Sequence, residues 1–218
     1  MWIKICANTN LADAALAAEL GADALGFVFA PSSRQVTPQQ VAAIISQLPS
    51  AIEKIGVFTT LDPAEIASAA QTAGLTGVQI HSEYSAAFVA TLAGLLPGIR
   101  IIQTTHQNVA SHSPEATASS IATLRTAPHV SAVLVDSRTA TASGGTGIAF
   151  DWSAARQALS ALIPMPLIVA GGLTPDNVQH AIEVLQPWGV DVASGVEATP
   201  GRKDPAKLAA FLKNARNS

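Results

Sequence analysis

Short apolar runs rich in Val, Ile and Phe alternate along the chain with longer segments rich in Ala and Leu. The short runs have the length and composition of buried strands, whereas the longer segments are typical of helices. Regular alternation of the two predicts a parallel sheet whose strands are joined by helices. The eight predicted strands are 2–6, 24–29, 54–58, 77–81, 99–104, 132–136, 167–170 and 190–193.

Eight helices are predicted between and after these strands. Five of them have a recognisable start, in which a capping residue precedes a proline at the first helical position. These starts are Thr37-Pro38, Asp62-Pro63, Ser113-Pro114, Thr174-Pro175 and Asp204-Pro205. The predicted helices cover 11–20, 38–48, 63–73, 86–95, 114–125, 152–162, 175–185 and 205–215.

The repeated strand and helix units predict a closed (β/α)8 TIM barrel, an α/β fold. Eight units in 218 residues leave about 27 residues each, which suits a barrel near the small end of the usual range. No stretch of the sequence has the composition of a linker, so we expect residues 1–218 to form a single barrel domain. A doubly wound open sheet is the alternative, but it would normally place a glycine-rich turn after the first strand. Here that strand leads into Cys6-Ala7-Asn8-Thr9-Asn10, which contains no glycine.

Composition narrows the classes of protein that remain. Hydrophobic residues make up 49% of the chain and charged residues 12%, which excludes intrinsic disorder. The single cysteine excludes an intramolecular disulfide and a multi-thiolate zinc site, and it suits a reducing compartment. A net charge of −3 without a basic run predicts neither nucleic acid nor an anionic membrane as a partner. Without a signal peptide or a membrane-spanning run, the sequence predicts a soluble, cytoplasmic protein.

Polar residues at the ends of predicted strands are the first candidates for chemistry. In a (β/α)8 barrel the active site lies at the carboxyl ends of the strands. Four residues meet this condition: Cys6, His81, Asp136 and Asp191. Each also has a purely structural interpretation. A free cysteine is most often a buried apolar residue, and the other three side chains could cap turns or satisfy backbone groups.

Two glycine clusters follow the last two predicted strands. They are Ala170-Gly171-Gly172-Leu173-Thr174-Pro175 and Ala193-Ser194-Gly195-Val196-Glu197. Barrels frequently bind phosphate between these two loops, where exposed backbone N–H groups face the anion. Gly171, Gly172, Ser194 and Gly195 are therefore candidate phosphate ligands. A third cluster, Ser143-Gly144-Gly145-Thr146-Gly147, could form a lid or add Gly145 as a further donor.

Together these motifs resemble the phosphoribosylanthranilate isomerases of tryptophan biosynthesis, a branch of aromatic amino acid biosynthesis. The matching segments run in the family's order over nearly the whole chain. They are Lys4-Ile5-Cys6, 21–29, 56–58, 78–81, 135–137, 144–147, 150–152, 170–178, 190–197 and 200–204.

The resemblance implies a reaction and a catalytic pair. Cys6 would be the general base and Asp136 the general acid of an aldose–ketose isomerase. The reaction is the Amadori rearrangement of N-(5-phosphoribosyl)anthranilate to 1-(o-carboxyphenylamino)-1-deoxyribulose 5-phosphate. The family uses no metal and no organic cofactor. Its partner would be this small phosphorylated substrate, and we expect a monomer or a weak homodimer.

Further roles follow from the same resemblance. Arg34, in the loop after the second strand, and His81 would contact the anthranilate end or order the acid and base. Asp191 would orient substrate hydroxyls or a neighbouring residue. Three positions depart from the usual family pattern, since Ala7 and Ser82 stand where glycine is common and Gln35 stands where an aromatic residue is common.

Two other functions remain open on the sequence alone. One is a related barrel that acts on another phosphosugar, as an isomerase, an epimerase or a synthase. The other is a barrel that binds phosphorylated ligands without catalysis. The presence of both Cys6 and Asp136 favours the isomerase over the second of these.

Overall fold

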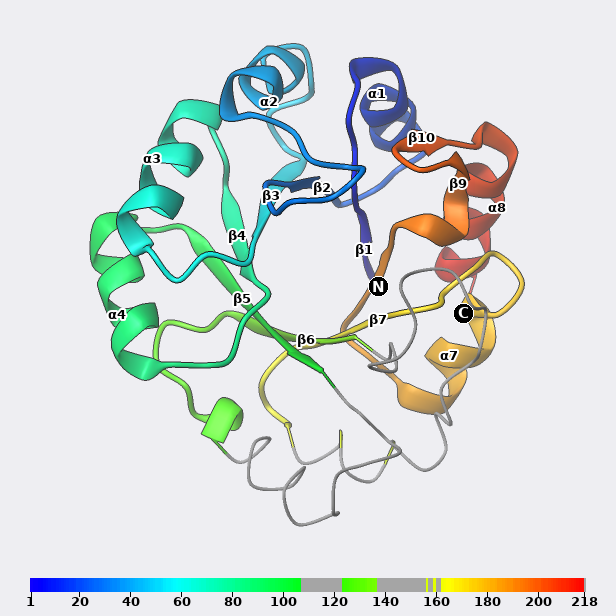
Figure 1. Ribbon diagram of the computed structural model, residues 1–218. Coiled ribbons are helices and arrows are strands. Elements are labelled where there is room, and N and C mark those ends of the chain that lie inside the picture. The colour runs from blue at the N-terminus through cyan, green and yellow to red at the C-terminus, as the bar shows by residue number, and fades with distance from the viewer. Residues whose placement is uncertain (107–122, 137–155, 157–158, 160–161, 218) are drawn as a thin grey trace.

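A computed structural model describes residues 1–106, 123–136, 156, 159 and 162–217 of the chain, and its strands form a closed barrel (Figure 1). The eight strands follow one another around the barrel in chain order and are all parallel. They are β1 (Trp2–Ile5), β2 (Ala24–Val28), β3 (Glu53–Phe58), β4 (Gly77–Ile80), β5 (Arg100–His106), β6 (Ala132–Asp136), β7 (Leu167–Ala170) and β8 (Gly189–Val192).

The pairing of the last strand with the first decides between the two predicted architectures. Residues Trp2 to Ile5 of β1 pair in register with Gly189 to Val192 of β8. A doubly wound open sheet would not pair its first strand with its last and would leave two edge strands, whereas here every strand is paired on both sides. The predicted (β/α)8 barrel is therefore confirmed.

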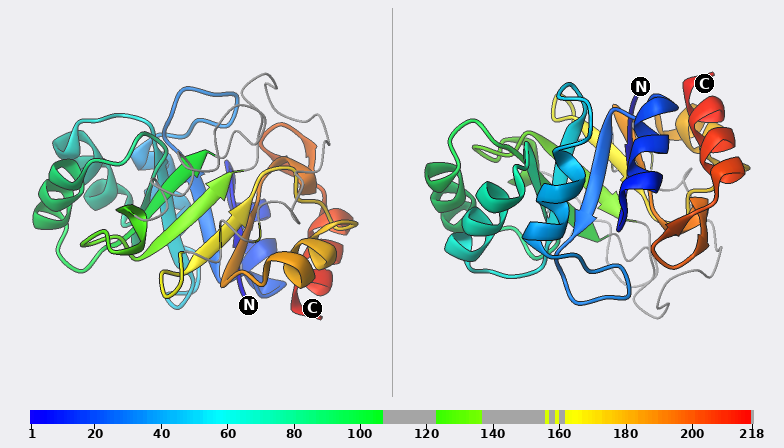
Figure 2. Two further views of the ribbon diagram at one scale, coloured as in Figure 1. Left: turned by 90° about the horizontal axis from the view of Figure 1, so that it is seen from below. Right: turned by 90° about the horizontal axis from the view of Figure 1, so that it is seen from above.

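The helices lie outside the barrel, and α1 and α8 are neighbours beside the closing strand pair (Figure 2). They are α1 (Leu11–Glu19), α2 (Pro38–Ile45), α3 (Pro63–Ala73), α4 (Ala86–Leu95), α7 (Val178–Leu185) and α8 (Pro205–Arg216). Most of the predicted helices 114–125 and 152–162 lies outside the described residues. Within them, residues 123–125, 156 and 159 are helical.

The capping residues that precede a proline act as predicted in three of the described helices. Thr37 forms a capping box with Gln40, and Asp62 and Asp204 each accept hydrogen bonds from two backbone N–H groups of the first turn. Ser113 lies outside the described residues.

The predicted start of α7 at Pro175 is wrong, because that helix begins at Val178. The Asn177 side chain accepts a hydrogen bond from Thr174 N at 2.8 Å and donates one to Gly172 O at 3.0 Å. These two bonds hold residues 174–177 in a turn before the helix, so Thr174 is not its cap.

Buried apolar residues form two separate layers. One fills the barrel interior and the other fills the space between the barrel and its helices, since successive side chains of a strand point to opposite faces. Phe27 and Ile80 are examples of the outer layer. The interior layer consists of Trp2, Ala24, Ile55, Ile102, Ala132, Leu134, Ile168 and Ala170.

The segment after β8 contains elements that the sequence did not predict. A 3-10 helix, η1 (Ser194–Val196), leads into a small antiparallel hairpin of β9 (Glu197–Thr199) and β10 (Arg202–Lys203). This hairpin lies between α1 and α8 in Figure 1. It returns the chain to the carboxyl end of β1 before α8 begins.

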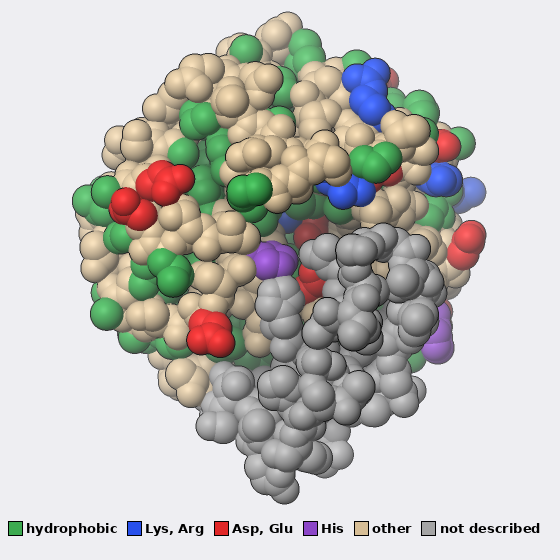
Figure 3. All heavy atoms as spheres, in the orientation of Figure 1, with side chains coloured by type: hydrophobic (Ala, Val, Ile, Leu, Met, Phe, Trp, Pro, Cys, Tyr) green, Lys and Arg blue, Asp and Glu red, His purple; other side chains and the backbone are tan. Residues whose placement is uncertain are grey.

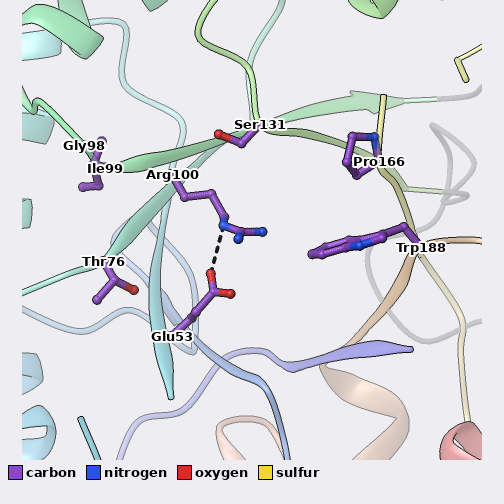
Figure 4. Close-up of a pocket in the computed structure, with 8 residues that line it drawn as sticks. All are labelled: Glu53, Thr76, Gly98, Ile99, Arg100, Ser131, Pro166 and Trp188. Atoms are coloured by element: carbon purple, nitrogen blue, oxygen red, sulfur yellow. Dashed lines mark ion pairs between the residues drawn. The ribbon is translucent and has the colours of Figure 1, made fainter. Parts of the chain in front are cut away.

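Aromatic and charged side chains close the amino end of the barrel (Figure 4). The rings of Trp2 and Trp188 stack with centroids 5.1 Å apart, and the Arg100 guanidinium lies 5.5 Å from the centroid of the Trp188 ring. Arg100 Nε is 3.0 Å from Glu53 Oε2, and Trp2 Nε1 donates to Glu53 Oε1 at 3.1 Å. A pocket bordered by Glu53, Arg100 and Trp188 therefore lies at the end of the barrel opposite the predicted site.

In the part of the chain that the structure describes, the helices are too short or too polar to cross a membrane.

The cap of α8 gives a test of this local structure. Asp204 accepts from Ala206 N at 2.9 Å and from Lys207 N at 3.1 Å, whereas Ser85, which caps α4, accepts only from Phe88 N at 3.4 Å. Asp204→Ala is expected to lower the free energy of unfolding by about 1 kcal/mol. Ser85→Ala serves as the comparison and should cost less. Urea unfolding measures both, and an equal or smaller loss for Asp204→Ala would contradict the contribution assigned to its cap.

Candidate active site

Cys6 and Asp136 both point into the barrel at the carboxyl end of the strands. Cys6 lies on the same face of its strand as Trp2, an interior residue, and its backbone N donates to Val192 O at 2.8 Å, which continues the ladder. Asp136 lies on the same face of β6 as Leu134, another interior residue. Both side chains are buried. Acidic and basic side chains and a histidine lie around a hollow near the middle of this face (Figure 3).

A lysine that the sequence analysis did not single out lies beneath these two residues. Lys4 is fully buried, and its Nζ donates to Gln79 Oε1 at 2.8 Å and to Asp191 Oδ1 at 3.1 Å. Gln79 in turn donates from Nε2 to Thr104 Oγ1 at 3.2 Å. One signal could have revealed this residue, because a lysine on the interior face of an apolar strand needs a partner of opposite charge.

The charges around Lys4 are strongly coupled. Burial alone would lower the pKa of Lys4, but the negative charge of Asp191 and hydrogen bonds to Asp191 and Cys6 raise it above its ordinary value. Lys4 therefore remains an ammonium ion. Burial raises the pKa of Asp191, Lys4 opposes this change, and the charge of Asp136 adds to it. Asp136 and Asp191 are thus close enough to repel each other when both are ionised.

Cys6 is held as a thiol in the resting protein. Burial raises the pKa of its thiol above the ordinary value, the charge of Asp191 acts in the same direction, and Lys4 and Lys203 oppose it. Glycine at position 26 makes room for this side chain. A Cβ atom there would lie 2.7 Å from Cys6 Sγ and 2.9 Å from Lys4 Cε, closer than carbon atoms normally approach either group.

The residues after Cys6 fix the direction of its loop. Asn8 is buried and donates from Nδ2 to Ile5 O at 2.7 Å and to Gly26 O at 3.2 Å. Ala7 has a φ of 62°, in the left-handed region that costs an L-residue about 1 kcal/mol. The usual family glycine at this position would adopt this conformation without that strain.

The structure brings the two predicted glycine loops together. Gly171 and Gly172 have φ values of 85° and 66°, and Ser194 begins the 3-10 helix that follows β8. A Cβ atom on Gly195 would overlap the carbonyl oxygen of Leu173, so the two loops touch at this glycine. The third predicted cluster, with Gly145, lies outside the described residues.

His81 lies at the edge of the same site. It follows β4 on the face that carries Gln79, its backbone N donates to Phe58 O at 2.8 Å, and the residue is half-buried. His81 and Asp191 therefore lie at the carboxyl end of the barrel with Cys6 and Asp136, as predicted from their places at strand ends.

The hairpin after β8 supplies two charged residues that the sequence analysis did not assign. Glu197 Oε2 lies 2.6 Å from Arg34 Nη2, and Glu197 Oε1 lies 3.6 Å from Lys203 Nζ. Lys203 Nζ also donates to the carbonyl oxygens of Cys6 and Ala193. Burial lowers the pKa of Lys203, and the charge of Glu197 opposes this shift. The only signal in the sequence was that these two charged residues lie in the family-matching segments 190–197 and 200–204.

Among the described residues, no group of three or more His, Cys, Asp or Glu side chains is placed to hold a metal ion.

The environment of Cys6 predicts slow reaction with alkylating reagents. Because Cys6 is the only cysteine, its modification by iodoacetamide can be followed by mass spectrometry without interference. At pH 7.5 we expect alkylation to be slower than in urea-unfolded protein. Its rate should still rise as pH passes the ordinary cysteine value of about 8.5, since only the thiolate reacts. A rate that levels off below this pH in the folded protein would contradict the raised pKa.

Comparison with known proteins agrees with this geometry. The family model described as N-(5'phosphoribosyl)anthranilate (PRA) isomerase matches residues 3–214. The N-(5'-phosphoribosyl)anthranilate isomerase of Pelobacter propionicus is 42% identical over 218 residues, with 99% of this chain and 96% of that protein covered.

Solved structures give the same result. The crystal structure of phosphoribosyl anthranilate isomerase from Thermotoga maritima superposes with a TM-score of 0.87 at 33% identity, and both chains are covered completely. A second phosphoribosyl anthranilate isomerase, solved with reduced 1-(o-carboxyphenylamino)-1-deoxyribulose 5-phosphate, has a TM-score of 0.83 at 32% identity, again with both chains fully covered. The chain has the barrel topology of these proteins, carries the family's motifs at its carboxyl end and matches them over nearly its full length. It therefore belongs to the phosphoribosylanthranilate isomerase family.

Proposed function

We propose that the chain catalyses the reaction of its family, the Amadori rearrangement of N-(5-phosphoribosyl)anthranilate in tryptophan biosynthesis. One observation carries the assignment of its catalytic pair. Cys6, directly after β1, and Asp136, at the end of β6, project into the same barrel mouth beside the buried Lys4–Asp191 ion pair. A base and an acid are thus available to one bound sugar from different strands.

The first step opens the ribose ring. Asp136, in its protonated form, donates to the ring oxygen while the bond between that oxygen and C1′ breaks. The lone pair of the anthranilate nitrogen forms a C=N bond to C1′, which gives a protonated Schiff base. Asp136 ends this step as a carboxylate.

The second step moves a proton from carbon. Cys6, as a thiolate, removes the C2′ proton, and the electrons of that bond flow toward nitrogen to give an enolamine. The enolamine then tautomerises to the ketone product. The scheme thus needs a thiolate and a carboxylic acid in the same complex.

The other site residues would bind the two ends of the substrate. Arg34 offers a planar fork that suits the anthranilate carboxylate, and His81 lies at the same mouth. Asp191 would orient hydroxyl groups, since Lys4 fixes one of its oxygens at 3.1 Å. Gly171, Gly172, Ser194 and Gly195 would receive the phosphate on backbone N–H groups, and Gly145 is proposed as a further donor. No step of this scheme requires a metal or an organic cofactor.

The proposal also covers the setting of the protein. We place it in the cytoplasm as a single barrel domain over residues 1–218, acting as a monomer or a weak homodimer. Its one cysteine suits a reducing compartment because the proposed mechanism needs that thiol unmodified.

Substitution of the catalytic pair tests the proposed function. Turnover is measured in a fluorescence assay with phosphoribosylanthranilate generated in situ. Cys6→Ser and Asp136→Asn should each lower kcat by about 100-fold or more, because each removes one proton-transfer group. Asp23→Asn makes the same acid-to-amide change at the opposite end of the barrel and should leave kcat unchanged. Full activity of either site variant would contradict its role, and an inactive wild type would contradict the function itself.

The contact between the glycine loops predicts a different kinetic effect. In Gly195→Ala the added methyl group would push the loop after β8 away from Leu173, which separates the proposed phosphate donors. We expect KM to rise by about tenfold, the loss of roughly one charged hydrogen bond, with a smaller change in kcat. Gly94→Ala on α4 is the control, since an added Cβ there meets no atom within 4 Å. An unchanged KM for Gly195→Ala would exclude these loops from phosphate binding.

A further inference from the structure

The Glu197 carboxylate holds Arg34 from one side. Arg34 Nε donates to Oε1 at 2.9 Å and to Oε2 at 3.1 Å, and Nη2 donates to Oε2 at 2.6 Å. Glu197 thus pairs with the edge of the Arg34 guanidinium that is formed by Nε and Nη2. The Arg34 side chain retains 26% of its exposure, whereas the Glu197 side chain retains only 4%. The buried acid is therefore the fixed member of the pair.

Glu197 is fixed by contacts other than Arg34. Gly201 N donates to its Oε1 at 3.2 Å, and Lys203 Nζ lies 3.6 Å from the same oxygen. Gly201 is itself tied to the loop after β1, because Thr9 Oγ1 donates to Gly201 O at 2.6 Å. Burial would raise the pKa of Glu197, but the hydrogen bonds from Arg34 and the charges of Lys203 and Arg34 lower it below its ordinary value. Glu197 is accordingly a carboxylate at neutral pH.

The loop that carries Arg34 is closed at its base. Val36 N donates to Val28 O at 2.9 Å, and Gln35 Nε2 donates to Phe29 O at 3.0 Å. These bonds fix the backbone on both sides of the loop. They do not fix the four rotatable bonds of the arginine side chain, whose freedom is costly to remove when a ligand binds. Glu197 removes that freedom in advance.

A guanidinium has two edges that can each pair with a carboxylate. The side edge consists of Nε and one Nη, and the end edge consists of Nη1 and Nη2. Glu197 uses the side edge of Arg34. A substrate carboxylate at the end edge would therefore meet a guanidinium whose plane is already set by a residue of the protein.

We propose that Glu197 is a positioning residue that sets substrate specificity: by holding Arg34 from its side edge, it favours an aglycone that carries a carboxylate. This inference rests on the proposed function, in which Arg34 binds the carboxylate of the anthranilate group. Glu197 also contacts Gly201 N and Lys203, but these contacts do not distinguish one aglycone from another, whereas its contact with Arg34 does. Its loss should therefore lower turnover most for substrates that Arg34 contacts.

Two substrates that differ only in the carboxylate test this inference. N-(5-phosphoribosyl)anthranilate and N-(5-phosphoribosyl)aniline are each prepared by condensing the amine with ribose 5-phosphate. The ratio of their kcat/KM values is measured for the wild type, Arg34→Met and Glu197→Gln. We expect Arg34→Met to lower the value for the anthranilate substrate by about 100-fold, and Glu197→Gln by about tenfold. Both variants should change the value for the aniline substrate by less than about twofold.

A matched control is available at the other end of the barrel. Glu53→Gln makes the same chemical change in a Glu–Arg ion pair, with Arg100, that lies far from the mouth. It should leave the ratio for the two substrates unchanged. If Glu197→Gln unfolds, which thermal unfolding will show, Glu197→Asp keeps the charge and shortens the reach. It should then give an intermediate ratio, because its carboxylate still pairs with Arg34 but holds it less firmly.

The remaining outcomes separate this inference from the proposed function. Equal losses for both substrates in Glu197→Gln would show a purely structural role and overturn the inference, as would no loss at all. If Arg34→Met does not discriminate between the substrates, the role of Arg34 is wrong and the inference falls with it, although the isomerase activity stands. If the wild type turns over neither substrate, the proposed function itself fails.

Discussion

The positive charge of Lys4 has to be neutralised inside the barrel, and this requirement organises the carboxyl half of the interior. An unpaired buried ion costs several kcal/mol, so the interior must supply partners wherever a lysine enters it. Gln79 from β4 and Asp191 from β8 provide them across the barrel, at 2.8 and 3.1 Å. Asp191 in turn lies near Asp136, and Lys4 lies against Cys6. The proposed acid and the proposed base are thus placed around one fixed ion pair.

The two ends of the barrel contain different kinds of side chain. The amino end is closed by stacked tryptophans and a half-buried Glu53–Arg100 pair, which supports the fold and carries no group proposed for chemistry. The carboxyl end gathers buried charges instead, which are costly to stability and useful for reaction. Apolar residues such as Leu134 and Ile168 separate the two ends.

Much of the fold followed from local sequence signals. Strand positions were predictable because β-branched runs alternate with helix-forming segments, and Asp62 and Asp204 were predictable as caps from the prolines after them. The inward direction of Cys6 and Asp136 follows from strand periodicity once the ends of the strands are known. The start of α7 was predicted wrongly, because the side-chain bonds of Asn177 compete with the proline signal at Pro175.

Long-range contacts could not be predicted from sequence in the same way. The pairing of Arg34 with Glu197 joins residues 163 positions apart, and no local pattern specifies it. Lys4 was visible only as an exception within an apolar strand. The hairpin that carries Glu197 and Lys203 was missed because its strands are only three and two residues long, too short to show alternation.

The hydrogen bond from Lys203 to the carbonyl oxygen of Cys6 joins residues 197 positions apart. The backbone of the proposed base is therefore held by a segment that emerges from the ribosome only when almost the whole barrel has been made. Contacts of such large sequence separation form late, since the loop they close is costly in entropy. A partly folded chain would then contain Cys6 directly after β1 but would lack the contact with Lys203 that fixes the backbone of Cys6. Catalytic competence in this barrel thus reports that the ring has closed.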